Sequence, residues 1–232
     1  MKRIDLFSNA LTGTIPSEFG NIPSLQIIHF KANSLSGMVT LIVCVMTSFC
    51  ITNHLLHYLG TLPPTLLNGL PNFVWLDVSG NKITGTIPPS YGQSQSLKDL
   101  RLGGNLIYGP IAGELCTNKK LNDSPEGDKY DCDHILCPLG AISDAGYATK
   151  DFGCTPCPEG QSTMHLGSDS CRVFTDEDIL KMFYELLGGD ETWDQTFQAD
   201  WTSDKPVCEW HGVTCGGGEV TGLSFPNSGL KL

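Results

Sequence analysis

Positive charge is scarce in this chain of 232 residues, which carries 14 Lys and Arg against 25 Asp and Glu. The imbalance lies in one half, because residues 1–115 carry a net charge of +1 and residues 116–232 carry −12. Phosphates repel an acidic surface, so nucleic acid is not expected as a partner. The sequence also lacks a glycine-rich phosphate-binding loop, a Ser–His–Asp arrangement and a kinase signature. We therefore expect no intrinsic enzyme activity and no cofactor.

The first half of the chain contains a repeated motif. The pattern Leu-x-Leu-x-x-Asn-x-Leu-x-Gly-x-Ile-Pro, with Ile or Val replacing Leu at some positions, occupies residues 4–16 and returns at residues 76–88. A fixed period indicates stacked copies of one supersecondary unit. Such a stack offers an extended concave surface, which predicts binding rather than catalysis.

The asparagines of the motif set its period. Asn9 and Asn33 are 24 residues apart, and Asn81 and Asn105 repeat that spacing. Before each Asn stand two alternating apolar residues, which predict a short strand with one inward face. The amide side chain can satisfy backbone groups that are left unpaired where the chain turns off the strand. The predicted inward pairs are Ile4 and Leu6, Ile28 and Phe30, Leu76 and Val78, and Leu100 and Leu102.

The Gly-x-Ile-Pro ending of the motif resembles the plant-specific class of leucine-rich repeat. This resemblance implies a right-handed coil with a parallel sheet on its concave side. The predicted fold class is an α/β solenoid with short parallel strands, followed by a disulfide-rich module and a small helical cap. We expect the boundaries to be residues 1–115 for the repeats, 116–172 for a cysteine-rich spacer and 173–232 for the cap.

One repeat is interrupted by residues 38–60, which contain no Asp, Glu, Lys or Arg. The segment could be an extraneous insertion, such as a translated intron, because removing it restores a nearly regular repeat. It could also be a membrane span, since 23 residues are long enough, although polar residues interrupt its second half. A third hypothesis is a degenerate repeat, because Asn33 and Asn81 are 48 residues apart, which is twice the period.

Eight of the ten cysteines follow the repeats in a stretch rich in turns. An even number in such a stretch indicates disulfides and an oxidising compartment. Zinc is the rival hypothesis, because two cysteine pairs there have ligand-like spacing, and a redox-active Cys-x-x-Cys is a third. The eight are Cys116, Cys132, Cys137, Cys154, Cys157, Cys171, Cys208 and Cys215.

The Cys-Pro-x-Gly turns within residues 116–172 resemble the small disulfide modules of ephrin-receptor-like and tumour-necrosis-factor-receptor-like ectodomains. The resemblance implies three disulfides, Cys116–Cys132, Cys137–Cys154 and Cys157–Cys171. Asn122 begins an Asn-Asp-Ser pattern that is typical of a glycosylation acceptor.

The last part of the chain combines a helix signal with a short cysteine motif. Thr175, followed by an acidic residue three positions later and by helically spaced apolar residues, predicts a capped helix. The pattern Cys-x-Trp-x-Gly-Val-x-Cys at residues 208–215 resembles the N-terminal cap of plant-type leucine-rich repeat proteins. The resemblance implies a Cys208–Cys215 disulfide, and a second repeat array beginning before residue 232.

The outward positions of the predicted strands form the candidate binding surface. Trp75 is the first candidate, because an exposed Trp on a concave sheet is unfavourable unless it is covered and Trp is a common interface hot spot. The polar neighbours predicted to share this surface are His29, Lys31, Asp77 and Arg101.

These features predict a non-catalytic module that recognises a protein or peptide. By resemblance it would be a fragment of a receptor-like ectodomain, outside the cell or on its surface. A membrane contact could come through residues 38–60 or through regions missing from this sequence. The alternative is an extracellular inhibitor of a secreted hydrolase, or a structural protein of the wall or matrix.

Overall fold

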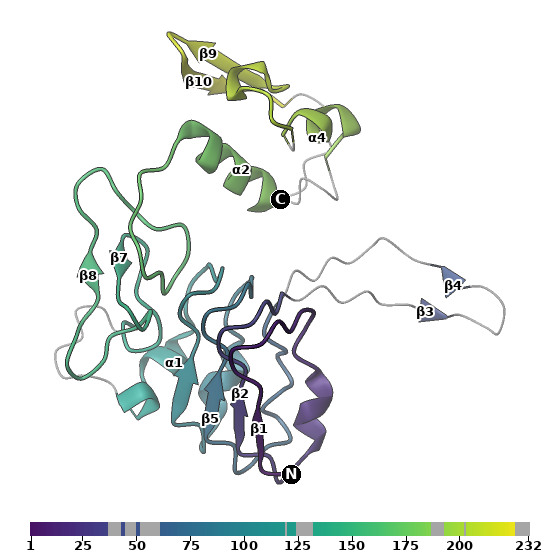
Figure 1. Cartoon of the computed structure of the whole chain (residues 1–232), viewed down its shortest axis with the longest axis vertical. Helices are drawn as coiled ribbons and strands as arrows, with labels where there is room; N and C mark the ends of the chain where they lie inside the picture. Colours follow the sequence, from purple (N-terminus) through teal and green to yellow (C-terminus); the bar gives the residue numbers. More distant parts are fainter. Residues whose placement is uncertain are drawn as a thin grey trace. The chain divides into compact units, whose positions relative to one another are not determined.

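The computed structural model describes residues 1–36, 43–44, 50–51, 61–118, 120–123, 132–186, 193–201 and 203–225. The chain forms two compact units, Met1–Arg172 and Val173–Leu232, called here the repeat unit and the terminal unit. Figure 1 shows short parallel arrows in the repeat unit and helices with a hairpin in the terminal unit. The predicted fold class, a leucine-rich repeat solenoid with short parallel strands, is confirmed.

A four-stranded parallel sheet is the framework of the repeat unit. Its order is β1 (Arg3–Asp5), β2 (Ile27–His29), β5 (Trp75–Asp77) and β6 (Asp99–Arg101). The strands pair in matching register, so equivalent residues of successive repeats lie beside one another. The central residue of each strand points inward, and those of β2, β5 and β6 are completely buried. The outward residues of the same strands form the concave face.

The remaining elements of the repeat unit are short. Two 3-10 helices lie on the return path of the repeats, η1 (Ser17–Asn21) and η2 (Pro89–Gln93). The insertion carries β3 (Val43–Cys44) and β4 (Cys50–Ile51), which pair antiparallel. The cysteine-rich region contains α1 (Gly113–Cys116), η3 (Leu121–Asp123), β7 (Ala141–Ile142) and β8 (Thr155–Pro156).

Asparagine side chains connect each repeat to the repeat before it. Asn81 donates its amide to the backbone oxygens of Val78 in its own repeat and Phe30 in the previous one, at 2.9 and 3.0 Å. Its Oδ1 accepts from the backbone N–H of Leu35 at 2.9 Å. Asn33 and Asn105 make the equivalent contacts. The predicted role of this Asn is therefore confirmed, and it extends across repeats.

The pairing of β2 with β5 decides one question about the insertion. Ile27 lies opposite Trp75, so no repeat strand from residues 38–60 stands between these two strands. The degenerate-repeat hypothesis is therefore wrong. Most of the segment lies outside the described residues. Within the described ranges, no helix is long and apolar enough to cross a membrane.

The cysteine-rich region packs on the last repeat and continues the solenoid. Gly104 donates its backbone N–H to Gly167 at 2.9 Å, in the same way that Gly80 donates to Gly103 one repeat earlier. Asn122 pairs with the edge strand β6, because its Oδ1 accepts from Leu100 N at 2.7 Å and its Nδ2 donates to the Leu100 oxygen at 2.8 Å. The region thus covers the apolar end of the stack, which would otherwise be exposed to water.

The terminal unit contains α2 (Asp176–Leu186), α4 (Gln195–Trp201), η4 (Val207–Glu209), β9 (Val213–Gly216) and β10 (Glu219–Leu223). Trp193, Trp201 and Trp210 are buried at its centre, and the last two donate their indole N–H groups to backbone oxygens at 2.9 and 2.8 Å. Thr175 and Asp178 cap α2 reciprocally, because each side chain accepts from the backbone N–H of the other. This is the predicted capping box, with Asp at its third position.

Candidate ligand-binding surface

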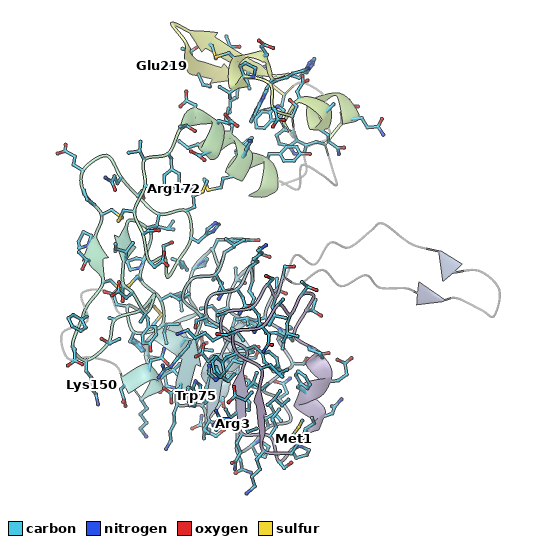
Figure 2. The ribbon with its side chains drawn as sticks, in the orientation of Figure 1. Met1, Arg3, Trp75, Lys150, Arg172 and Glu219 are labelled. Atoms are coloured by element: carbon cyan, nitrogen blue, oxygen red, sulfur yellow. A yellow bond between two sulfur atoms is a disulfide. The ribbon has the colours of Figure 1, made fainter. Side chains whose placement is uncertain are left out.

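The structure places four of the five predicted surface residues on neighbouring strands. His29 ends β2, Trp75 and Asp77 begin and end β5, and Arg101 ends β6. His29, Asp77 and Arg101 are register partners, so they form one column across the sheet. Lys31 lies two residues beyond the end of β2 and is exposed. Figure 2 labels Arg3 and Trp75, which belong to β1 and β5, the two strands on either side of β2.

A continuous stack of planar groups crosses the concave face. The ring of Phe7 lies 5.0 Å from that of His29, and the ring of His29 lies 5.8 Å from that of Trp75, both centroid to centroid. The guanidinium of Arg101 lies 5.3 Å from the centroid of the Trp75 ring. Each of the four repeats contributes one member. Because the faces of the planar groups contact one another, their edges are what a ligand would meet.

Phe7 is the member of this stack that sequence reasoning did not select. It is 53% exposed and occupies an outward position of the first repeat. The alternation of inward and outward positions does place Phe7, three residues after Ile4, on the outward side of the strand. Its contact with His29 is diagonal across repeats, however, and the pattern within one repeat does not reveal such a contact.

Carboxylates bracket the imidazole of His29. Its Nδ1 lies 3.1 Å from Asp5 Oδ1, close but not aligned as a hydrogen bond, and its Nε2 lies 3.6 Å from Asp77 Oδ2. The hydrogen bond from Arg3 lowers the pKa of the Asp5 carboxyl, against a smaller opposing effect of desolvation. The two carboxylates face different nitrogens of one ring, so they do not converge on a common point. Within the described ranges, no cluster of His, Cys, Asp and Glu could hold a metal ion.

Asp77 is a supporting residue more than an exposed contact. Its side chain is almost completely buried, and its Oδ1 accepts hydrogen bonds from the hydroxyl and the backbone N–H of Ser79 at 2.7 and 3.1 Å. These bonds stabilise the charged carboxylate, since a buried carboxylate without partners would be strongly unfavourable. Asp77 therefore contributes to this surface through its charge and through its contact with His29.

Two N–H donors on this surface have no acceptor in the described part of the chain. The indole Nε1 of Trp75 and the Nε of Arg101 are buried, and neither has a hydrogen-bond partner among the residues that the structure describes. The terminal Nη2 of Arg101 donates to Asp99 Oδ1 at 3.4 Å, so only its Nε remains unpaired. An unpaired buried donor costs about 1–3 kcal/mol, and an acceptor from a bound molecule would remove that cost.

The cysteines outside the insertion are all paired, as Cys116–Cys132, Cys137–Cys154, Cys157–Cys171 and Cys208–Cys215. These are the pairs that the two resemblances implied. Thiolate ligands for zinc and a free Cys-x-x-Cys are incompatible with this pairing.

The glycosylation prediction at Asn122 fits the structure poorly. Asn122 is only 7% exposed, and its side-chain nitrogen donates to the backbone oxygens of Leu100 and His134, both at 2.8 Å. A glycan bonded to this nitrogen would replace one of the two hydrogens that make these bonds. The acceptor pattern is therefore better explained by a structural asparagine at the end of the solenoid.

Comparison with known proteins was consistent with this architecture. The Leucine Rich Repeat family profile matches residues 1–22 and 72–94. Receptor like protein 21 of Arabidopsis thaliana is 29% identical over 118 residues, which are 50% of this chain and 12% of that protein. Receptor-like protein 39 of the same organism is 28% identical over 115 residues, 48% of this chain and 13% of that protein. The chain thus spans about an eighth of the length of these relatives.

Solved structures with some similarity include two plant proteins. The BIR2 ectodomain from Arabidopsis thaliana is 27% identical with a TM-score of 0.39, over 51% of this chain and 50% of that one. The plant peptide hormone receptor RGFR1 in complex with RGF2 is 29% identical with a TM-score of 0.40, over 52% of this chain and 16% of that one. The repeat motif, the parallel strands and the family match show a leucine-rich repeat fold, and its repeats are similar to those of plant receptor-like proteins.

Proposed function

We propose that this chain recognises a peptide or an extended protein segment on the concave face of its repeats, without catalysing a reaction itself. The observation that carries the proposal is the stack of Phe7, His29, Trp75 and Arg101, with the unpaired N–H groups of Trp75 and Arg101 beside it. Each residue of a peptide carries a backbone carbonyl, which could accept from these buried donors once the side chains that cover them move.

The rigidity of the surface also supports this proposal. Neighbouring side chains hold each member of the stack, so little rotamer freedom is lost when a ligand binds. Trp and Arg are the side chains most often found at the energetic centre of protein interfaces. The negative charges of Asp5, Asp77 and Asp99 lie on the same face, which disfavours a polyphosphate ligand.

The setting that we propose is extracellular or at the cell surface, as part of a receptor-like ectodomain. Four disulfides in one chain are typical of an oxidising compartment. The sequence relatives are receptor-like proteins, which favours the same setting.

The test uses the secreted, disulfide-intact full chain and a displayed library of random twelve-residue peptides as the probe. Binders are selected on the wild type, and their affinities are then measured for Trp75→Ala. We expect a loss of about 30-fold or more, which corresponds to a hot-spot effect of about 2 kcal/mol. Phe152→Ala is the matched control, because Phe152 is a highly exposed aromatic residue in the cysteine-rich region, outside the sheet. The proposal fails if the selected peptides bind Trp75→Ala as tightly as the wild type.

A further inference from the structure

We infer that the recognition surface continues beyond β6 into the cysteine-rich region, and that Tyr147 determines which peptides bind at that end. The inference rests on the proposed function, and it adds a second region of the chain to the same site. The partner that fits is a peptide carrying a hydrogen-bonding polar group opposite the fourth repeat.

The cysteine-rich region is held against the fourth repeat by backbone contacts. Gly104 donates its N–H to Gly167 at 2.9 Å, and Leu166 donates to Ile107 at 2.9 Å. Both bonds run between the last repeat and the segment before Cys171, whose disulfide holds that segment in turn. Because the two regions share one compact unit, residues on either side can contribute to one site.

The loop of residues 143–147 lies on the concave side of the fourth repeat. Gly103 occupies an outward position, equivalent to Ser79 in the third repeat. A Cβ at Gly103 would lie 2.3 Å from the backbone oxygen of Ala145 and 2.8 Å from Cα of Gly146. The loop thus fills the space that a side chain would take on the other strands, and it forms a wall at the end of the concave face.

The same loop fixes the position of Tyr147. The Ser143 hydroxyl donates to the Tyr147 backbone oxygen at 3.0 Å, and Cys137 donates its N–H to Gly146 at 2.8 Å. Cys137 is itself held by its disulfide to Cys154. Tyr147 is therefore anchored on both sides, and most of its side chain is buried.

Tyr147 lies within electrostatic reach of the predicted binding residues. Burial raises the pKa of its phenol, the charge of Arg101 opposes that effect, and the charges of Asp99 and Asp77 add to it. The phenol is protonated at neutral pH, so it can both donate and accept a hydrogen bond. Together with the guanidinium of Arg101, whose side chain is 41% exposed, it gives this end of the surface more than one polar group for a ligand.

The test compares single-atom changes in the intact full chain. Tyr147→Phe removes only the hydroxyl, and Tyr108→Phe is the matched control, because Tyr108 belongs to the same repeat but follows Asn105, beyond the strand. The probes are the peptides selected from the random library. Among the peptides whose binding depends on Trp75, we expect Tyr147→Phe to lower the affinity of some by about 3- to 10-fold, the effect of one hydrogen bond. Tyr108→Phe should leave all these affinities unchanged.

A second readout separates recognition from a structural effect. The phenol ¹³Cζ resonance of Tyr147, assigned by its loss in Tyr147→Phe, is expected to shift when such a peptide is added. A second library selection on Tyr147→Phe should yield peptides with a changed residue preference at one position. The inference is overturned if Trp75→Ala lowers the affinity of the peptides but Tyr147→Phe lowers that of none, or if the Tyr147 resonance does not shift. If Trp75→Ala has no effect on any peptide, the proposed function itself fails.

Discussion

The contact between the cysteine-rich region and the last repeat can be tested with two glycines that share one backbone conformation. Gly146 and Gly160 both have φ of +76°, a region that costs a residue with a Cβ about 1–2 kcal/mol. A Cβ at Gly160 meets nothing within 4 Å, whereas a Cβ at Gly146 would lie 2.4 Å from Cα of Gly103 and 2.6 Å from the Gly167 oxygen. Gly160→Ala therefore isolates the backbone strain, and Gly146→Ala adds displacement of the loop.

The difference between the two variants follows from the bonds that the displacement breaks. Displacement of the loop that carries Gly146 disturbs two backbone hydrogen bonds, Gly104 to Gly167 across the junction and Cys137 to Gly146 within the cysteine-rich region. Each contributes about 0.5–1.5 kcal/mol. We expect Gly160→Ala to lower the free energy of unfolding by about 1–2 kcal/mol and Gly146→Ala by about 3 kcal/mol or more.

The assay for these two variants is thermal unfolding of the oxidised full chain, monitored by calorimetry. For a unit of this size about 1 kcal/mol corresponds to a shift in Tm of roughly 2–4 °C. The transition of the terminal unit is the internal control and should not move. Equal shifts in Gly146→Ala and Gly160→Ala would refute the packing of this loop on the fourth repeat.

Three further predictions concern other parts of the chain. Asn81→Ala removes three buried hydrogen bonds and leaves the Leu35 N–H unpaired, while the Phe30 and Val78 oxygens keep their bonds from Asn33 and Asn105. It should destabilise the repeat unit by about 2–4 kcal/mol in urea unfolding, whereas the exposed Asn9→Ala should cost under about 1 kcal/mol; equal losses would contradict the asparagine series. Thr175→Ala should lower the stability of the terminal unit alone by about 1 kcal/mol, and a loss confined to the repeat unit would contradict its capping role. Burial raises the pKa of the Tyr91 phenol, so its stabilising contribution is complete below about pH 10 and is lost as the pH rises further. Between about pH 8 and 11 the free energy of unfolding should therefore fall less steeply with pH in Tyr91→Phe than in the wild type. An unchanged slope would contradict this prediction.

The repeats were predictable because their information is local. The alternation of Ile28 and Phe30 and the position of Asn33 are set within a dozen residues, and the 24-residue period then stacks one copy on the next. Trp75 was assigned to the concave face on the same grounds. The period also places equivalent residues of successive repeats beside one another, and the register shows Ile27, Trp75 and Asp99 in one column.

Contacts between distant segments were not predictable in the same way. Gly103, Gly146 and Gly167 meet at one point, although more than 60 residues separate the first from the last. No pattern in the sequence marks such a meeting. Asn122 shows the reverse case, because its local pattern indicates a glycosylation acceptor while its contact with Leu100 makes it structural.

The burial of polar groups on the concave face was also beyond sequence reasoning. Asp77 occupies an outward position, which predicts exposure, but Ser79 and the stack around His29 cover it. Phe7 belongs to this stack through a diagonal contact that depends on the side-chain rotamers of two repeats. Position in the motif therefore indicates which face a residue occupies, whereas its exposure depends on its neighbours.

The most direct test of the central claim is a crystal structure of the full chain bound to a peptide from the library selection. We predict a peptide lying across β2, β5 and β6, with contacts to the edge of Trp75 and to Arg101, and with one polar group beside Tyr147. A peptide bound on the return side of the repeats, or on the terminal unit, would contradict recognition through the concave face.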